Sequence, residues 1–204
     1  MDELAGTDAW HRALRTPDAL VGGPAGPSLS ARLEGWLADA RVDGSADGRA
    51  RERWLQMAAE ADATFSGVLA DLAERRSTVA LTTTAGRRHH GAIEVLGADF
   101  VSLRVAAGAE VLVALRAVAS VRSIGPADAA VGEQAVVTTL TLGEVLSELA
   151  AERTRALLVT GDGHDAVAGE LRAAGQDVVT VRTDAQPPGT AYVRLASVAE
   201  VALG

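Results

Sequence analysis

The stretch "TFSGVLADLAERRSTVAL", which begins at Thr64, returns later in the chain as "TLGEVLSELAAERTRALL", which begins at Thr141. Two further segments return in the same order: "GAIEVLGADFVSLRV" from Gly91 as "GELRAAGQDVVTVRT" from Gly169, and "VALRAVASV" from Val113 as "VRLASVAEV" from Val193. The offset between the copies drifts from 77 to 80 residues, and the added residues fall where turns are expected. A repeat of this length predicts a duplicated structural unit.

Each copy begins with a helical pattern and continues with strand patterns. Thr64 and Thr141 are predicted N-caps of helices with apolar residues at helical spacing. After each helix the period switches to two, and turns containing Gly separate short runs of Val and Leu. The strands expected in the first copy are Val79–Leu81, Gly91–Val95, Val101–Val105, Val111–Leu115 and Val118–Arg122. Short, bent strands of this kind are typical of small barrels.

We therefore predict a fold that is mainly β with helices (α+β). It consists of two tandem five-stranded barrels, each preceded by a helix, and an N-terminal helical segment. Trp36 and Trp54 of that segment are expected to be core or staple residues. The predicted boundaries are a mobile lead-in at 1–28, the helical segment at 29–62, the first barrel at 63–125, a linker at 126–137 and the second barrel at 138–204.

Composition limits the possible functions. The chain has no Cys, which excludes disulfides and thiolate chemistry, and no run of 18 apolar residues, so we expect a cytoplasmic protein with no membrane contact. All 19 basic residues are Arg, and the net charge is −8. Residues 63–125 carry 7 Arg against 5 acids, whereas residues 126–204 carry 5 Arg against 11 acids. A polyanion, if one is bound, is therefore expected on the first barrel.

The first copy resembles the Sm-like barrel family, and in particular its bacterial Hfq-type members. The matching pattern is "G-x4-G-x-I-E" followed by "D-F-V-x-L", carried by Gly86, Gly91, Ile93, Glu94, Phe100, Val101 and Leu103. The resemblance implies SH3-like barrels that join edge strand to edge strand, often in RNA-binding rings. Ala114, Leu115 and Arg116 stand where Hfq-type proteins carry an aromatic–Lys–His run, and Ser102 lies near the base-binding Asn position of other Sm proteins.

Five arginines of the first copy are candidate RNA or polyanion contacts. Arg87 and Arg88 belong to "GRRHH" (86–90), which is either a phosphate-binding cluster or a solvated hairpin turn. Arg75 and Arg76 end the first predicted helix, where they suit its dipole, and Arg104 lies on the third strand. Adjacent His89 and His90 point to opposite faces of a strand, and "GDGHD" (161–165) is expected to be a turn, so neither predicts a metal site.

No catalytic motif is recognisable, and we expect no enzyme activity, no cofactor and no metal. The favoured function is a non-enzymatic Sm-like scaffold or interaction module that self-assembles, or binds a protein partner, through its edge strands. The alternative is an RNA-binding Sm-like protein that contacts RNA through the basic first barrel. The sequence leaves a capped monomer, a dimer and a ring open.

Overall fold

A computed structural model describes residues 28–40, 64–105, 108–124, 135–161, 163 and 165–204 of the 204-residue chain. The predicted lead-in up to residue 27, the predicted helical stretch at 41–62 with Trp54, and the linker residues 126–134 lie outside the described residues.

Two sets of elements follow one another with the same order and the same lengths. The first unit contains α4 (Phe65–Glu74), β1 (Thr78–Thr83), β2 (Arg88–Leu96), β3 (Phe100–Val105), β4 (Glu110–Ala114), η4 (Leu115–Ala117) and β5 (Val118–Ser123). The second unit contains α5 (Leu142–Ala151), β7 (Arg155–Thr160), β8 (Ala166–Ala174), β9 (Val178–Thr183), β10 (Thr190–Arg194), η5 (Leu195–Ser197) and β11 (Val198–Leu203). Each residue within these elements of the first unit therefore has a counterpart at the same position of the matching element in the second unit. The duplication of an ancestral module stays a prediction.

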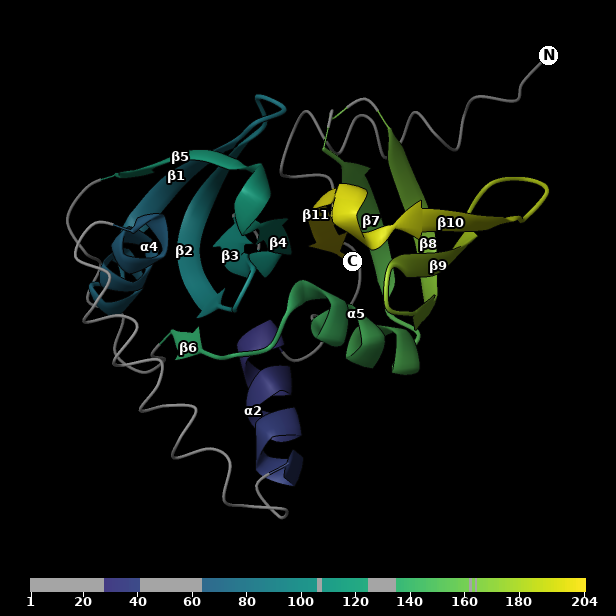
Figure 1. Cartoon of the computed structure of the whole chain (residues 1–204), viewed down its shortest axis with the longest axis horizontal. Coiled ribbons are helices and arrows are strands. Elements are labelled where there is room, and N and C mark those ends of the chain that lie inside the picture. The colour runs from purple at the N-terminus through teal and green to yellow at the C-terminus, as the bar shows by residue number, and fades with distance from the viewer. Residues whose placement is uncertain (1–27, 41–63, 106–107, 125–134, 162, 164) are drawn as a thin grey trace.

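The two units share one open sheet, and the prediction of two closed barrels is wrong. The strand order is β10-β9-β8-β7-β11-β4-β3-β2-β1-β5, with β6 (Val136–Val137) added in parallel to β2. A closed barrel would need β4 to pair with β5 inside the first unit. Instead β4 pairs with β11 of the second unit, and β5 and β10 are the two ends of the sheet (Figure 1).

The pairing of β4 with β11 is called the central joint below. The strands are antiparallel, with Val201 opposite Leu112 and Leu203 opposite Glu110. All five residues of β4 are buried, as are the first four residues of β11. Main-chain ladder bonds and a continuous apolar core therefore hold the two units together.

Local sequence explains where the elements begin and bend. Thr64 and Thr141 cap α4 and α5, as predicted, through side-chain oxygens that accept from backbone N–H groups. Gly91 and Gly169 lie where neighbouring strands approach closely. A Cβ at Gly91 would lie 2.1 Å from the carbonyl oxygen of Arg104, and a Cβ at Gly169 would lie 2.0 Å from that of Arg182.

Helix α2 (Leu29–Ala40) lies below the central joint, next to α5 (Figure 1). Leu29 and Leu33 are fully buried in the core, and Trp36 packs against it, which agrees with its predicted core role. Among the described helices, none combines the length and the apolar character that a membrane crossing requires.

Replacing Gly91 by Ala should destabilise the first unit. The added methyl group meets a backbone carbonyl that cannot turn aside, so we expect the free energy of unfolding to fall by about 2 kcal/mol or more. Gly161→Ala is the matched control, because its Cβ would lie 3.9 Å from the nearest atom. Urea unfolding checks this, and equal losses in the two variants would contradict the close approach of β2 and β3.

Candidate functional site at the central joint

A buried carboxylate of the second unit reaches into the first unit. Glu200 lies on β11 and is 1% exposed. Its Oε2 accepts a hydrogen bond from Nε of Arg87 at 2.7 Å and lies 3.0 Å from Nε2 of His89. Its Oε1 is buried and has no hydrogen-bond partner among the described residues. We call Glu200, Arg87 and His89 the joint cluster.

The joint cluster keeps Glu200 ionised. Burial is the largest influence and by itself raises the pKa of Glu200. The hydrogen bond and charge of His89, together with those of Arg87, outweigh burial and hold the pKa of Glu200 below its usual value. The ion pair therefore stabilises the pairing of β4 with β11 at neutral pH.

Arg116 makes a second polar contact across the central joint. Its guanidinium donates from Nε to the carbonyl oxygen of Ala196 at 3.0 Å, and from Nη2 to the carbonyl oxygens of Leu195 and Val198 at 2.9 and 2.6 Å. Arg116 lies in η4 of the first unit, and its acceptors lie in and just after η5 of the second. A hollow of about 390 Å³ beside it is lined by residues of both units. Arg116 thus fixes the two short helical turns relative to each other.

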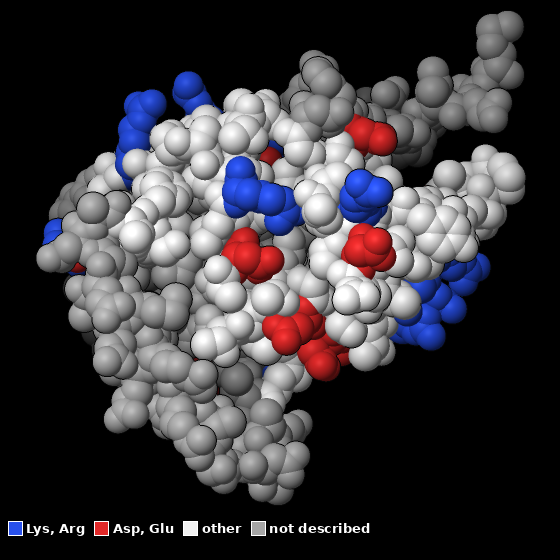
Figure 2. Space-filling view, in the orientation of Figure 1, with Lys and Arg blue, Asp and Glu red and all other residues white. Residues whose placement is uncertain are grey.

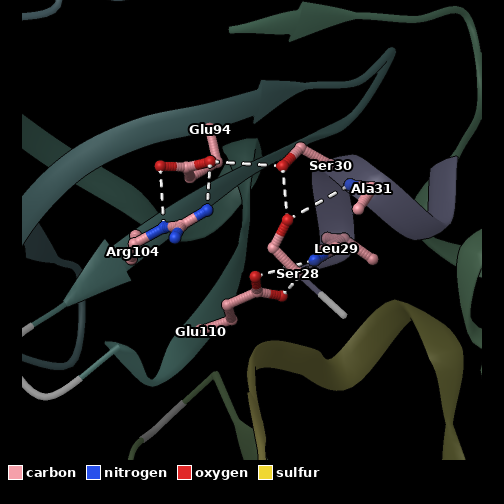
Figure 3. Close-up of polar contacts among 7 residues, drawn as sticks. All are labelled: Ser28, Leu29, Ser30, Ala31, Glu94, Arg104 and Glu110. Atoms are coloured by element: carbon pink, nitrogen blue, oxygen red, sulfur yellow. Dashed lines mark hydrogen bonds and ion pairs between the residues drawn. The ribbon is translucent and has the colours of Figure 1, made fainter. Parts of the chain in front are cut away.

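The N-terminus of α2 is held by two acidic side chains of the first unit (Figure 3). The backbone N–H of Leu29 donates to both carboxylate oxygens of Glu110, each at 2.7 Å. The hydroxyl of Ser30 donates to Glu94, whose two oxygens also accept from Arg104 at 2.9 Å each. The N–H of Leu29 is one of the first-turn donors that have no partner within the helix, and Glu110 supplies its acceptor. These contacts fix the start of α2 on β2, β3 and β4.

Further polar contacts connect α2 to the second unit and α5 to the first unit. Glu152, at the C-cap of α5, accepts from the indole Nε1 of Trp36 at 3.2 Å and lies 3.6 Å from Nε of Arg32. The backbone N–H of Leu142, at the start of α5, donates to Oδ1 of Asp99 in the first unit at 2.6 Å. Helix α2 therefore braces both units, and α5 is attached to the first unit at its N-terminus.

Internal contacts engage most of the arginines that were predicted to bind a polyanion. Arg87 and Arg104 bond to Glu200 and Glu94, as described, and Nη2 of Arg75 lies 2.8 Å from Asp71. Arg76 follows α4 with a positive φ of 52°. Arg88 is exposed at the start of β2. The five side chains are not brought together into one surface cluster, and on the face shown in Figure 2 basic and acidic side chains are interspersed.

Three important residues of the central joint were not predicted. Glu200 and Glu110 stand in Val-rich strands and carry no local signal, because their partners lie far away in the chain. Arg116 was noted only as a departure from the Hfq-type pattern. Ser102, noted near a base-binding position, is fully buried on β3. In the described part of the chain no group of three or more potential ligand side chains could hold a metal ion. The geometry is that of a joint between units.

Comparison with known proteins assigns the chain to no family. No family model matches the chain, and no curated protein matches it. The resemblance of residues 63–125 to the Sm-like family therefore stays a prediction from the residues themselves.

Replacing Glu200 by Gln should weaken the central joint in a pH-dependent way. Because the folded pKa of Glu200 is lowered, its charge stabilises the fold above the usual glutamate pKa of about 4.3, and this contribution is lost as the pH falls through the folded value. We expect a loss of about 1–3 kcal/mol at pH 7 that shrinks as the pH falls through the folded pKa of Glu200. Glu148→Gln, exposed on α5, is the control in urea unfolding. A constant loss at all pH values would contradict the ion pair.

Replacing Glu110 by Gln should have the opposite pH dependence. Burial, the largest influence, raises the pKa of Glu110 despite the N–H of Leu29 and the charge of Arg104. A raised folded pKa means that this carboxyl stabilises the fold at low pH and that the contribution is lost as the pH rises through the folded value. Gln keeps an acceptor for Leu29 without the buried charge. The difference in unfolding free energy between the variant and the wild type should therefore shift in favour of the variant as the pH rises from pH 4 to pH 7. Urea unfolding checks this. A variant that loses stability relative to the wild type over this pH range would contradict the raised pKa of Glu110.

Proposed function

We propose that the chain is a non-enzymatic assembly module in which the free edge of β5 in one copy pairs with the free edge of β10 in the next. These two strands end the sheet. They are also the counterparts of β11 and β4, the strands that pair at the central joint. The chain therefore carries, at its two outer edges, the same two strand positions that it already joins in its middle.

The burial of counterpart residues is the observation that carries the proposal. Leu112 on β4 is fully buried, whereas its counterpart on β10, Tyr192, is 74% exposed. Val201 on β11 is fully buried, whereas its counterpart Val121 on β5 is half-buried. Exposed apolar side chains on an unpaired strand edge favour the addition of another strand. Pairing in the register of the central joint would place Val121 opposite Tyr192.

Charge favours a head-to-tail order of the copies. The first-unit segment, residues 63–125, carries 7 Arg and 5 acids, and residues 126–204 carry 5 Arg and 11 acids. Pairing β5 with β10 sets a basic unit against an acidic one, whereas pairing β10 with β10 sets two acidic units together. Complementary charge steers association and suppresses the wrong order. Head-to-tail contacts of this kind form rings or filaments.

The outer contact should be weaker than the central joint. At the counterpart positions of the joint cluster the chain has Ser120 for Glu200, Asp165 for Arg87 and Val167 for His89. Ala196 stands in place of Arg116, so the outer contact also lacks an arginine that could donate to main-chain carbonyl groups of the neighbouring unit. An association without these charged contacts is expected to be reversible and to depend on concentration.

RNA binding through the first unit has less support. Arg75, Arg87 and Arg104 already pair with carboxylates of the same chain, and breaking these pairs would oppose RNA binding. Arg88 is exposed at the start of β2, and Arg122 is exposed on β5. A few exposed cations provide little of the charge neutralisation that nucleic-acid binding requires. The contacts of these arginines therefore favour self-assembly over RNA binding.

Replacing Tyr192 by Lys should keep the chain monomeric. The ammonium would be buried at the β5–β10 contact, where the counterpart Leu112 is fully buried, so association should weaken at least about tenfold. Ser147→Lys, on the exposed face of α5, is the control. Sedimentation equilibrium should give wild-type masses that rise above 20.9 kDa with concentration, and 20.9 kDa for the variant. A wild type that stays at 20.9 kDa throughout would end the proposal.

A further inference from the structure

Helix α4 presents an apolar face to solvent that its counterpart helix buries. Phe65 and Val68 are 40% and 48% exposed, and Leu72, one turn further along, is half-buried. Their counterparts on α5 are Leu142, Val145 and Leu149, which are at most 1% exposed. The two helices have the same length and precede their strands in the same way, so the difference comes from their surroundings.

Each helix has one face that its own unit covers. Leu69 of α4 and its counterpart Leu146 of α5 are both fully buried, and so are Ala73 and Ala150 to within a few per cent. This shared face packs on the strands of the same unit, β2 for α4 and β8 for α5. The face formed by Phe65, Val68 and Leu72 is a second one, called the outer face of α4 below. In α5 the corresponding face is covered as well.

The cover of α5 includes the first unit. Its N-terminus is bonded to Asp99 in the turn between β2 and β3, and its C-cap is bonded to α2, which stands on the first unit. Figure 1 shows α5 below the central joint, with α2 beside it, whereas α4 lies at the far side of the first unit. The apolar residues that differ between the helices are therefore those that a neighbouring unit buries.

We propose that a second copy of the chain buries the outer face of α4, through the turn between β8 and β9 of its second unit. This inference rests on the proposed assembly and names a second contact within it. At the central joint the turn between β2 and β3 touches α5. Its counterpart in the second unit is Gly175–Asp177, in which Asp177 takes the place of Asp99 and is exposed. A copy that pairs its β10 with β5 brings this turn to α4.

The sequences of the two helices agree with such a partner. The first turn of α5 has its own acid, Glu144, which completes a capping box with Thr141, whereas α4 has no acid in its first turn. Asp177 of the neighbouring copy would supply a carboxylate there, as Asp99 does for Leu142. The apolar outer face then loses contact with water, which favours association. Phe65 is the counterpart of Leu142, so its backbone N–H is the expected donor.

Engineered cysteines test the contact directly, because the chain has no Cys of its own. A mixture of Asp177→Cys and Phe65→Cys chains should form a mixed disulfide under mild oxidation, identified by peptide mass spectrometry. The double variant Asp99→Cys, Leu142→Cys should form the matching disulfide within one chain and serves as the positive control. Asp177→Cys mixed with Glu74→Cys, at the other end of α4, should form none. Equal yields of the two mixtures would overturn the inference.

A second variant separates this inference from the proposed function. Val68→Ser should weaken self-association about tenfold without lowering the urea midpoint, since Val68 is half exposed in the monomer. Glu74→Ser, on the same helix, should leave association unchanged. If the wild type assembles and Val68→Ser assembles equally well, α4 is outside the contact and the edge-strand proposal stands. A wild type that stays monomeric at every concentration overturns both.

Discussion

The antiparallel pairing of β4 with β11 is the constraint on which the rest of the molecule depends. A strand edge carries unpaired N–H and C=O groups that must find partners or remain in water. The first unit satisfies its β4 edge with a strand from the second unit, so neither unit needs to close on itself. Because of this, one sheet runs through both units, β4 is buried along its whole length, and the remaining open edges are moved to β5 and β10.

The polar contacts around this pairing occur at the central joint and have no equivalent at the two outer edges of the sheet. Glu200 with Arg87 and His89, and Arg116 with the carbonyl groups of η5, connect the first unit to the second. Their counterparts are uncharged or of another sign, so the outer edges carry no equivalent. Burying an ion pair costs desolvation free energy, and burying one charge without its partner costs more. Such pairs are therefore suited to specifying one partner in one register. The central joint is thus the permanent contact of the fold.

The individual helices and strands could be predicted from the sequence, whereas the pairing of the edge strands could not. The alternation of Val79 and Leu81, and the N-caps Thr64 and Thr141, report on the chain nearby, and the elements are found where these patterns place them. Whether β4 meets β5 or β11 is decided between residues about 90 positions apart, on which no local pattern bears. In the structure β4 meets β11, whose Glu200 bonds to Arg87 and His89 of the first unit, whereas β5 has Ser120 at the equivalent position.

The same limit explains why the contacts of the candidate site were not predicted. "GRRHH" looks like a free basic cluster because its anionic partner, Glu200, lies more than 100 residues away. Arg104 and Glu94 lie ten residues apart on neighbouring strands, and that pair could have been found by aligning the expected hairpin. The repeat itself was the most useful signal, because differences between counterparts, such as Leu112 and Tyr192, identify the surfaces that a neighbour covers.

Hydrogen–deuterium exchange measured at low and high protein concentration tests the central claim most directly. The account predicts that amides of β4 and β11 are protected at both concentrations, because their partners belong to the same chain. The amides of β5 and β10 that face away from β1 and β9 should exchange quickly in dilute protein and become protected as the concentration rises. Rapid exchange of β4 and β11, or protection of these β5 and β10 amides that ignores concentration, would contradict it.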